Sequence, residues 1–247
     1  MSESWIVGIN PVDSALRNDP AAVRELLLEG GRRNPRVQEL AERARQLHIA
    51  VRQVERAELE RHAAAARHQG VAVRCELAPV VQETDLSALL ARDGAQTLVL
   101  VLDGVTDPHN LGACLRCAAA AKATAVVVPK DRAVGLTPVV RRAAAGGAEL
   151  VPLVAVTNLA RTLRELKAAG VWITGLAGGG GQSIHAVDLH GPTALVLGGE
   201  GDGLRRLTRE LCDFVAEIPM PGAMESLNVS VATGIALFEA LRQRGAR

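Results

Sequence analysis

Three polar or glycine-rich segments of the chain carry side chains that could bind and orient a polar substrate, and each follows an apolar run. In the first, DGVTDPHNLGA at 103–113, Asn110 can cap a helix that opens at Leu111, and Arg116 lies roughly two turns further on. In the second, LGGEGDGL at 197–204, the carboxylate of Glu200 stands among glycines, whose bare backbone lets a ligand approach closely. These segments therefore combine an amide, a guanidinium and a carboxylate.

The third segment, IPMPGAMESLNVSVA at 218–232, predicts the start of a helix. Ser226 is a good N-cap for a helix beginning near Leu227, and Asn228 and Ser230 would then project from its first turn. The positive end of a helix dipole favours phosphate or carboxylate there. Capping without a binding function explains the same pattern equally well.

Two other motifs are weak on their own. The glycines at 198–203 resemble a dinucleotide fingerprint poorly, because Leu204 stands where a third small residue is expected and no ribose-binding acid follows. Glu200 could also be an ordinary turn acid. Cys114 and Cys117 form a C-x-x-C with no second pair at zinc-ligand spacing, so we interpret them as small apolar residues near a helix and predict no metal.

These segments need a scaffold, and the apolar runs between 97 and 218 predict one. Short runs at 97–102, 125–128, 151–154, 171–174, 194–197 and 214–218 alternate with helical stretches at 111–121, 138–145, 158–169, 204–212 and 227–244. Continuous apolar strands alternating with helices indicate an α/β domain with a parallel sheet covered on both faces. Ligands of such sheets bind beyond the carboxyl ends of the strands, where the three segments lie. The glycine run at 178–181 we interpret as a flexible loop.

The first part of the chain predicts a smaller α/β domain. Strands are expected at 5–9, 24–28, 50–54 and 71–76, and helices from Pro11, over 35–47 and over 56–66. A turn at 30–36 carries Arg32, Arg33 and Arg36 and no acid. Residues 78–96 read as a linker with one short helix. The predicted organisation is therefore a domain at 1–77, a linker at 78–96 and a domain at 97–247.

Composition limits the kind of partner. The 247 residues are 48% apolar and 22% charged with a formal net charge of +1, and the aromatic residues are two Trp and two Phe. So few rings exclude an RNA module that stacks many bases. A local basic site remains open, because residues 116–142 hold six basic side chains against one acid. A solvated surface accounts for that cluster as well.

Targeting features point to the cytoplasm. The longest apolar runs are strand-sized, so no membrane span is expected, and the first residues lack the features of a secretory signal. Four cysteines in a chain of this length suggest a reducing compartment.

Taken together, the three segments resemble the three motifs of the SpoU (TrmH-type) branch of the SPOUT methyltransferases. The likeness extends to VPKDR at 128–132, VTNLART at 156–162 and HQG at 68–70, so it covers nearly the whole chain. It is closer still to the bacterial 23S rRNA guanosine 2′-O-ribose methyltransferases. The departures are mild, with Pro221 and Glu225 varying inside the third segment.

The resemblance implies a C-terminal domain with a deep trefoil knot, a small N-terminal eL30-like RNA-binding domain, and a homodimer packed partly through the C-terminal helix. It implies S-adenosylmethionine as cofactor and 23S rRNA as partner. Two sets of positions carry over from the family: the catalytic positions are Asn110, Arg116, Glu200, Ser226 and Asn228, and the cofactor positions are Gly198, Gly199, Ile218, Met220 and Leu227. The predicted RNA-binding positions come from the arginine-rich turn and the basic stretch at 116–142, and are Arg32, Arg33, Arg36, Arg132, Arg141 and Arg142.

The activity implied is methylation of a ribose 2′-hydroxyl on a guanosine in the peptidyl-transferase loop of 23S rRNA. Alternatives within the family are a tRNA guanosine or another rRNA nucleotide. Outside it stand a non-catalytic ribosome-assembly protein and a nicotinamide oxidoreductase, the latter disfavoured by the broken glycine fingerprint. His109 adjoins Asn110 and is interpreted as a loop residue rather than a base.

Overall fold

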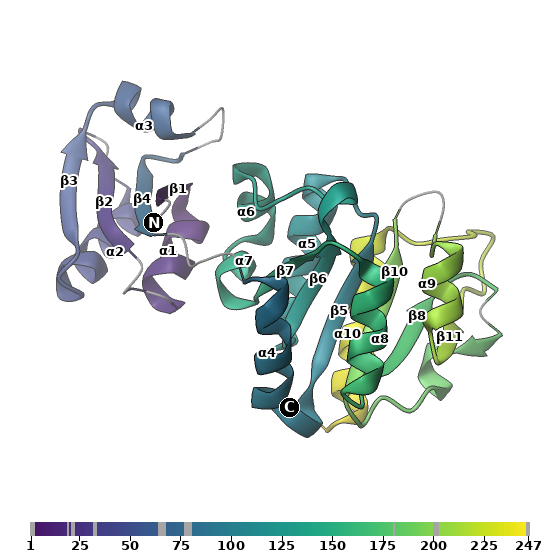
Figure 1. Cartoon of the computed structure of the whole chain (residues 1–247). Helices are drawn as coiled ribbons and strands as arrows, with labels where there is room; N and C mark the ends of the chain where they lie inside the picture. The colour runs from purple at the N-terminus through teal and green to yellow at the C-terminus, as the bar shows by residue number, and fades with distance from the viewer. Residues whose placement is uncertain are drawn as a thin grey trace.

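The computed structural model describes residues 3–18, 20, 23–31, 34–63, 68–76, 81–179, 181–199 and 203–245. In this part of the chain the strands form two separate sheets, each with helices on both faces (Figure 1). The first sheet comes from the N-terminal residues and the second from the rest. This arrangement confirms the α/β class expected from the sequence.

The first sheet has the strand order β1-β4-β2-β3 within the described residues. Its strands are β1 (Glu3–Val7), β2 (Val23–Glu29), β3 (Ala50–Val54) and β4 (Val71–Glu76), and its helices are α1 (Ile9–Asn18), α2 (Pro35–Gln46) and α3 (Arg56–Ala63). β4 pairs antiparallel with β1 and β2, whereas β2 and β3 run parallel. The predicted elements are present, although α1 begins two residues before Pro11.

The two faces of this sheet are covered by different helices. Val12 and Leu16 of α1 and Leu40 of α2 pack on one face, and Leu59 of α3 packs on the other. The start of α2 shows why the helix forms at this position. The side chain of Asn34 accepts a hydrogen bond from the backbone N–H of Arg36 at 3.1 Å, and Pro35 occupies the first helical position.

The second sheet has seven parallel strands in the described residues, in the order β7-β6-β5-β10-β8-β11-β9. The strands are β5 (Leu98–Asp103), β6 (Ala125–Pro129), β7 (Leu153–Val156), β8 (Trp172–Leu176), β9 (Gln182–Ser183), β10 (Thr193–Gly198) and β11 (Phe214–Glu217). The helices are α4 (Leu86–Asp93), α5 (Pro108–Ala120), α6 (Pro138–Ala144), α7 (Gly147–Leu150), α8 (Leu159–Ala168), α9 (Arg206–Leu211) and α10 (Val229–Gln243). Short 3-10 turns lie at Glu83–Asp85, Gly94–Gln96, Lys130–Arg132 and Ile184–Ala186.

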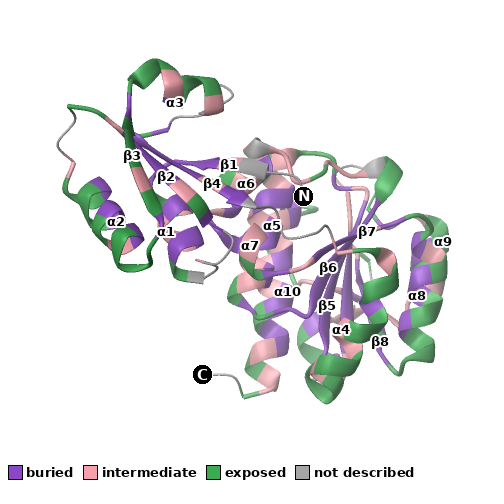
Figure 2. Cartoon of the chain, turned by 60° about the vertical axis from the view of Figure 1, so that its left-hand side comes forward, coloured by how far each residue is buried: buried purple, intermediate pink, exposed green. Residues whose placement is uncertain are grey.

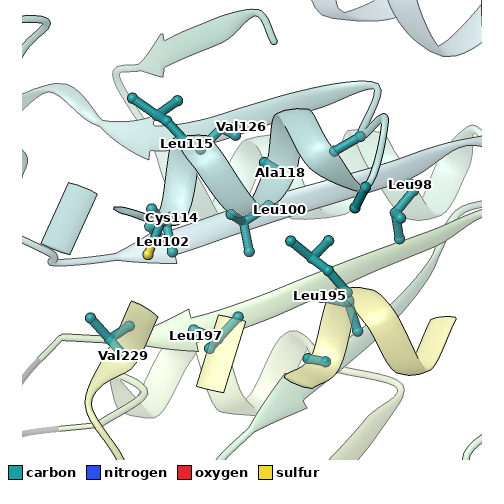
Figure 3. Close-up of a cluster of buried hydrophobic side chains, with 14 of the residues drawn as sticks. Leu98, Leu100, Leu102, Cys114, Leu115, Ala118, Val126, Leu195, Leu197 and Val229 are labelled. Carbon is teal, nitrogen blue, oxygen red and sulfur yellow. The ribbon is translucent and has the colours of Figure 1, made fainter. Parts of the chain in front are cut away.

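Alternating residues of the central strands serve two cores. Leu100 and Leu102 of β5 pack with Leu115 of α5 and with α10, as the close-up in Figure 3 shows. Val99 and Val101 belong to the opposite cluster, together with α4 and α8. Because both faces are covered, β5 and β6 are buried along their whole length (Figure 2), which explains their continuous apolar runs.

Several predicted boundaries change. β7 begins at Leu153, two residues later than expected, and the short elements β9 and α7 have no counterpart among the predictions. The short helix expected in the linker is α4, and its Leu86 is buried against the second sheet. The domain limits and the trefoil knot stay predictions. None of the helices in the described ranges is long and apolar enough to span a membrane.

Candidate active site

The loops that follow β8, β10 and β11 surround a cleft of about 640 Å³. These strands are neighbours in a parallel sheet, so their carboxyl ends meet at one edge. The cleft is lined by Leu176, Ala177, Gly178, Gly179, Leu197, Gly198, Gly199, Gly203, Glu217, Ile218, Met220, Met224, Glu225, Ser226, Leu227, Asn228, Val229 and Ala232. It therefore lies where ligands of open parallel sheets bind, beside the β5/β10 junction at which the strand order reverses.

Bare backbone forms one side of the cleft, which we call the glycine wall (Gly198, Gly199 and Gly203). Gly199 and Gly203 pair as an isolated antiparallel bridge. A Cβ on Gly198 would lie 2.0 Å from the carbonyl carbon of Gly203, and one on Gly199 would lie 2.4 Å from the carbonyl oxygen of Gly104. Since neither gap admits a methyl group, the glycines are required by close backbone approach.

All five positions predicted to hold a cofactor lie in the lining of this cleft: Gly198, Gly199, Ile218, Met220 and Leu227. The sequence interpretation missed the contribution of the loop after β8. Gly178 and Gly179 line the cleft, although the glycine run at 178–181 was interpreted only as a flexible loop. Its position after an apolar strand, like that of the other two loops, was the feature that could have identified it.

The first and third predicted segments meet through a hydrogen bond. The side-chain amide of Asn228 donates to Oδ1 of Asn110 at 3.0 Å. Ser226 and Asn228 also line the cleft, and we call Asn110, Ser226 and Asn228 the polar rim. Three of the predicted catalytic residues are thus gathered at the first turns of α5 and α10 and the loop before α10.

The predicted helix caps were wrong in both segments. The N-cap of α5 is Asp107, whose carboxylate accepts from the backbone N–H groups of His109 at 2.6 Å and Asn110 at 3.2 Å. Pro108 takes the first helical position, so the helix opens three residues before Leu111. Asn110 therefore lies within the first turn instead of capping it.

Asn228, not Ser226, caps α10, which begins at Val229. The Oδ1 atom of Asn228 accepts from the backbone N–H of Ser230 at 2.8 Å and from its hydroxyl at 2.6 Å. One side chain thus starts the helix through its oxygen and contacts Asn110 through its nitrogen. The cap and the predicted catalytic position are the same residue.

Arg116 lies on α5 with an exposed side chain and is not part of the cleft lining. Its helix is held closely on two sides. A Cβ on Gly147 would lie 2.8 Å from the Cα of Arg116, so α7 approaches α5 at this point. On the other side, the thiol of Cys114 lies 3.3 Å from the hydroxyl of Thr233 on α10. This packing holds Arg116 on the same helix as Asn110 and joins that helix to α10.

The cysteines behave as packed apolar residues. Burial raises the pKa of the Cys114 thiol to about 12 and also raises the pKa of Cys117. A thiol with a raised pKa is a poor nucleophile and a poor metal ligand. No group of three or more potential metal-binding side chains occurs in the ranges that the structure describes.

The predicted RNA-binding arginines have different environments. Arg36 and Arg142 are exposed, and Arg36 donates to Asn10 at 2.9 Å. Arg141 is only 12% exposed and pairs with Glu149 at 2.6 Å, so its side chain is committed to packing α6 against α7. The assignment of Arg141 to RNA binding stays a prediction, and its guanidinium is paired with Glu149 in this structure. Glu200, Arg32 and Arg33, and the side chain of Arg132, lie outside the described residues.

One ion pair with a buried carboxylate, beside the cleft, was not anticipated. Asp103 ends β5 with a side chain that is 0% exposed, and Nε of Arg205 donates to its Oδ1 at 2.6 Å. A carboxylate at the end of a wholly apolar strand is the sequence feature that could have identified the pair.

Comparison with known protein families shows to which family the chain belongs. The model of the SpoU rRNA methylase family matches residues 97–238, and the model described as RNA 2′-O ribose methyltransferase substrate binding matches residues 5–80. The chain belongs to the SpoU rRNA methylase family. The resemblance inferred from the three segments is confirmed.

Curated relatives span almost the full length. The chain is 56% identical to the 23S rRNA (guanosine-2′-O-)-methyltransferase RlmB of Xanthomonas campestris, over 97% of this chain and 96% of that protein. It is 52% identical to the protein of the same name from Pseudomonas aeruginosa, with the same shares covered.

Solved structures share the architecture of both parts. The SpoU methyltransferase AviRb from Streptomyces viridochromogenes, in complex with the cofactor AdoMet, superimposes with a TM-score of 0.80 at 25% identity, covering 99% of this chain and 92% of that one. An AdoMet-bound rRNA methyltransferase from Sinorhizobium meliloti gives a TM-score of 0.73 at 26% identity, covering 97% and 87%.

Proposed function

We propose that this protein transfers a methyl group from S-adenosylmethionine to the ribose 2′-hydroxyl of a guanosine in the peptidyl-transferase loop of 23S rRNA. The observation that carries the proposal is the cleft at the ends of β8, β10 and β11, which gathers all five predicted cofactor positions and borders the Asn110–Asn228 pair. The names of the full-length relatives support the substrate.

The cleft fits S-adenosylmethionine in size and in chemistry. Its volume of about 640 Å³ lies within the range of small-molecule sites. Apolar side chains such as Leu176, Ile218 and Leu227 suit an adenine ring, and the bare backbone of the glycine wall lets the polar atoms of the cofactor approach the main chain closely. Carboxylates are few in this lining, being Glu217 and Glu225. Recognition by backbone explains why glycines and apolar residues dominate.

The chemistry is a substitution at carbon. When bound, S-adenosylmethionine supplies a methyl group on a sulfonium, which is already a good leaving group. The 2′-oxygen forms the new bond to the methyl carbon, the carbon–sulfur bond breaks with its electron pair going to sulfur, and the hydroxyl proton must leave. The protein therefore has to align the reactants and stabilise the developing alkoxide.

We assign the stabilisation of the developing alkoxide to Arg116. An arginine is protonated at all physiological pH values, so it cannot act as a plain base. It can bind the phosphate next to the target ribose and the developing alkoxide, while a phosphate oxygen accepts the proton. Asn228, Ser226 and Glu200 would orient the ribose and the guanidinium. The hydrogen bond between Asn228 and Asn110 supports this arrangement by fixing the rim.

The proposal extends to the assembly of the protein. We propose a homodimer that packs through α10, because Val231 and Phe238 on this helix are 50% and 51% exposed. Exposed apolar side chains on one helix favour a protein interface. The N-terminal sheet and its arginines, Arg36 among them, would hold the rRNA through phosphates and shape, and the protein would act in the cytoplasm.

The decisive experiment maps 2′-O-methyl groups on the rRNA and tRNA of cells with and without this protein. Loss of one guanosine methylation in the peptidyl-transferase loop of 23S rRNA is expected. An intact rRNA map with a missing tRNA methyl group would refute the substrate. Unchanged maps for both RNAs would favour a non-catalytic role in ribosome assembly.

A further inference from the structure

The glycine wall is anchored by residues outside the cleft. Asp103 and Gly198 are register partners at the ends of the neighbouring strands β5 and β10. The backbone N–H of Gly199 donates to the carbonyl oxygen of Asp103 at 3.0 Å. Asp103 therefore contacts the entry to the glycine loop through its main chain.

The exit of the same loop contacts the side chain of Asp103. Nε of Arg205 donates to Oδ1 at 2.6 Å, the Nη2 atom of Arg205 contacts the same oxygen, and the backbone N–H of Arg205 approaches Oδ2 at 3.4 Å. One residue thus holds the two ends of a loop, at Gly199 and at Arg205. Neither Asp103 nor Arg205 lines the cleft.

The burial of the Asp103 carboxylate makes its pairing with Arg205 necessary. The Asp103 side chain is 0% exposed and Arg205 is 39% exposed. A buried carboxylate is unfavourable unless it is paired and hydrogen-bonded, and removing one partner leaves the other uncompensated. Leu204, next to Arg205, is buried in the core against Gly175, which anchors the exit of the loop further.

We propose that Asp103 and Arg205 are positioning residues for the cofactor: their ion pair holds the glycine wall at the spacing that S-adenosylmethionine requires. The inference rests on the proposed function and deepens it. Loosening the pair should widen the gap between Gly199 and Gly203 and weaken cofactor binding. The transfer step at saturating cofactor should change little, because Arg116 and the rim stay in place.

Calorimetric titration of the full-length protein with S-adenosylmethionine and S-adenosylhomocysteine tests the proposal. We expect Arg205→Gln to weaken both affinities about tenfold. In assays on a 23S rRNA fragment, the KM for the cofactor should rise while kcat is retained. Arg206→Gln is the matched control, because Arg206 is 82% exposed and pairs with Glu210 on the surface. The affinity of this variant for the cofactor should stay within about twofold of the wild-type value.

Asp103→Asn is the second single variant. The double variant Asp103→Asn with Arg205→Gln removes both charges, so it leaves no uncompensated buried carboxylate. If the two residues act through each other, the double variant should bind no more weakly than the worse single variant. Affinities within about twofold of the wild type, additive losses, or a fall in kcat with unchanged KM would overturn the inference. Failure of the wild-type protein to bind either compound would instead refute the proposed function.

Discussion

The glycine wall and the polar rim border the same cleft but are built by opposite means. The wall consists of backbone packed so closely that a Cβ at Gly198 or Gly199 would meet another chain segment at 2.0 or 2.4 Å. The rim consists of polar side chains at helix starts, such as the half-buried Asn110 and the exposed Asn228, which hydrogen bonds hold in place. The difference separates two tasks: shape for binding in the wall, and orientation for chemistry in the rim.

The largest effect is expected in the wall. Gly198→Ala places a methyl group against the backbone of Gly203, so the loop must move and the cleft changes shape. We expect cofactor affinity to fall by about 100-fold or more, measured by calorimetric titration. Gly191→Ala is the matched control, because a Cβ there meets nothing within 4 Å, and its affinity should not change. Tight binding by Gly198→Ala would show that the wall is not rigid.

The next effect concerns Arg116, which stands outside the lining and should serve chemistry alone. Arg116→Lys keeps the charge but removes the planar fork that can hold a phosphate and an alkoxide together. We expect the single-turnover rate to fall by about 100-fold with unchanged cofactor affinity. A near-normal rate in this variant would remove Arg116 from its assigned role.

A smaller effect separates capping from orientation at Asn228. Serine is an equally good N-cap but cannot reach Asn110, so Asn228→Ser should keep the melting temperature and lower the single-turnover rate about tenfold. Asn158→Ser is the matched control, because Asn158 is the N-cap of α8 and its Oδ1 accepts a hydrogen bond from the backbone N–H of Arg161. This variant should change neither the melting temperature nor the single-turnover rate. Equal rates in the two variants would reduce Asn228 to a cap.

The smallest effect lies at the opposite end of α10, which should influence stability without touching the cleft. Hydrogen bonds from Arg242, Gln243 and His185 hold the pKa of Glu239 at about 2, below its ordinary value of 4.5. A lowered pKa stabilises the fold above pH 4.5, and this contribution is lost as the pH falls toward 2.

Urea unfolding at a fixed protein concentration, at pH 5 and at pH 3, checks this expectation. The free energy of unfolding should fall less with acid in Glu239→Gln than in the wild type, while cofactor affinity at pH 7 stays the same in both. A change in affinity would mean that the far end of α10 is coupled to the rim.

Much of the fold was predictable because burial leaves a periodic mark on the sequence. β3 and β4 were predicted with the observed bounds, and the apolar runs located the central strands of the second sheet. The first residues of the helices were harder to predict where two neighbouring residues could each serve as the N-cap. Asp107 and Asn228 displaced the predicted caps Asn110 and Ser226, because the proline at 108 and the loop at 218–228 decide where the helical turns begin.

The residue types of the site, and the three segments that carry most of them, could be recognised from the amino-acid sequence. They could be recognised because those segments follow apolar strands and keep a specific order of chemical groups. Which of these residues touch is a property of the folded chain. Asn110 and Asn228 are 118 residues apart, and Asp103 and Arg205 are 102 apart. Such contacts depend on strand order across the sheet, which placed β10 beside β5, and local periodicity carries no information about that order.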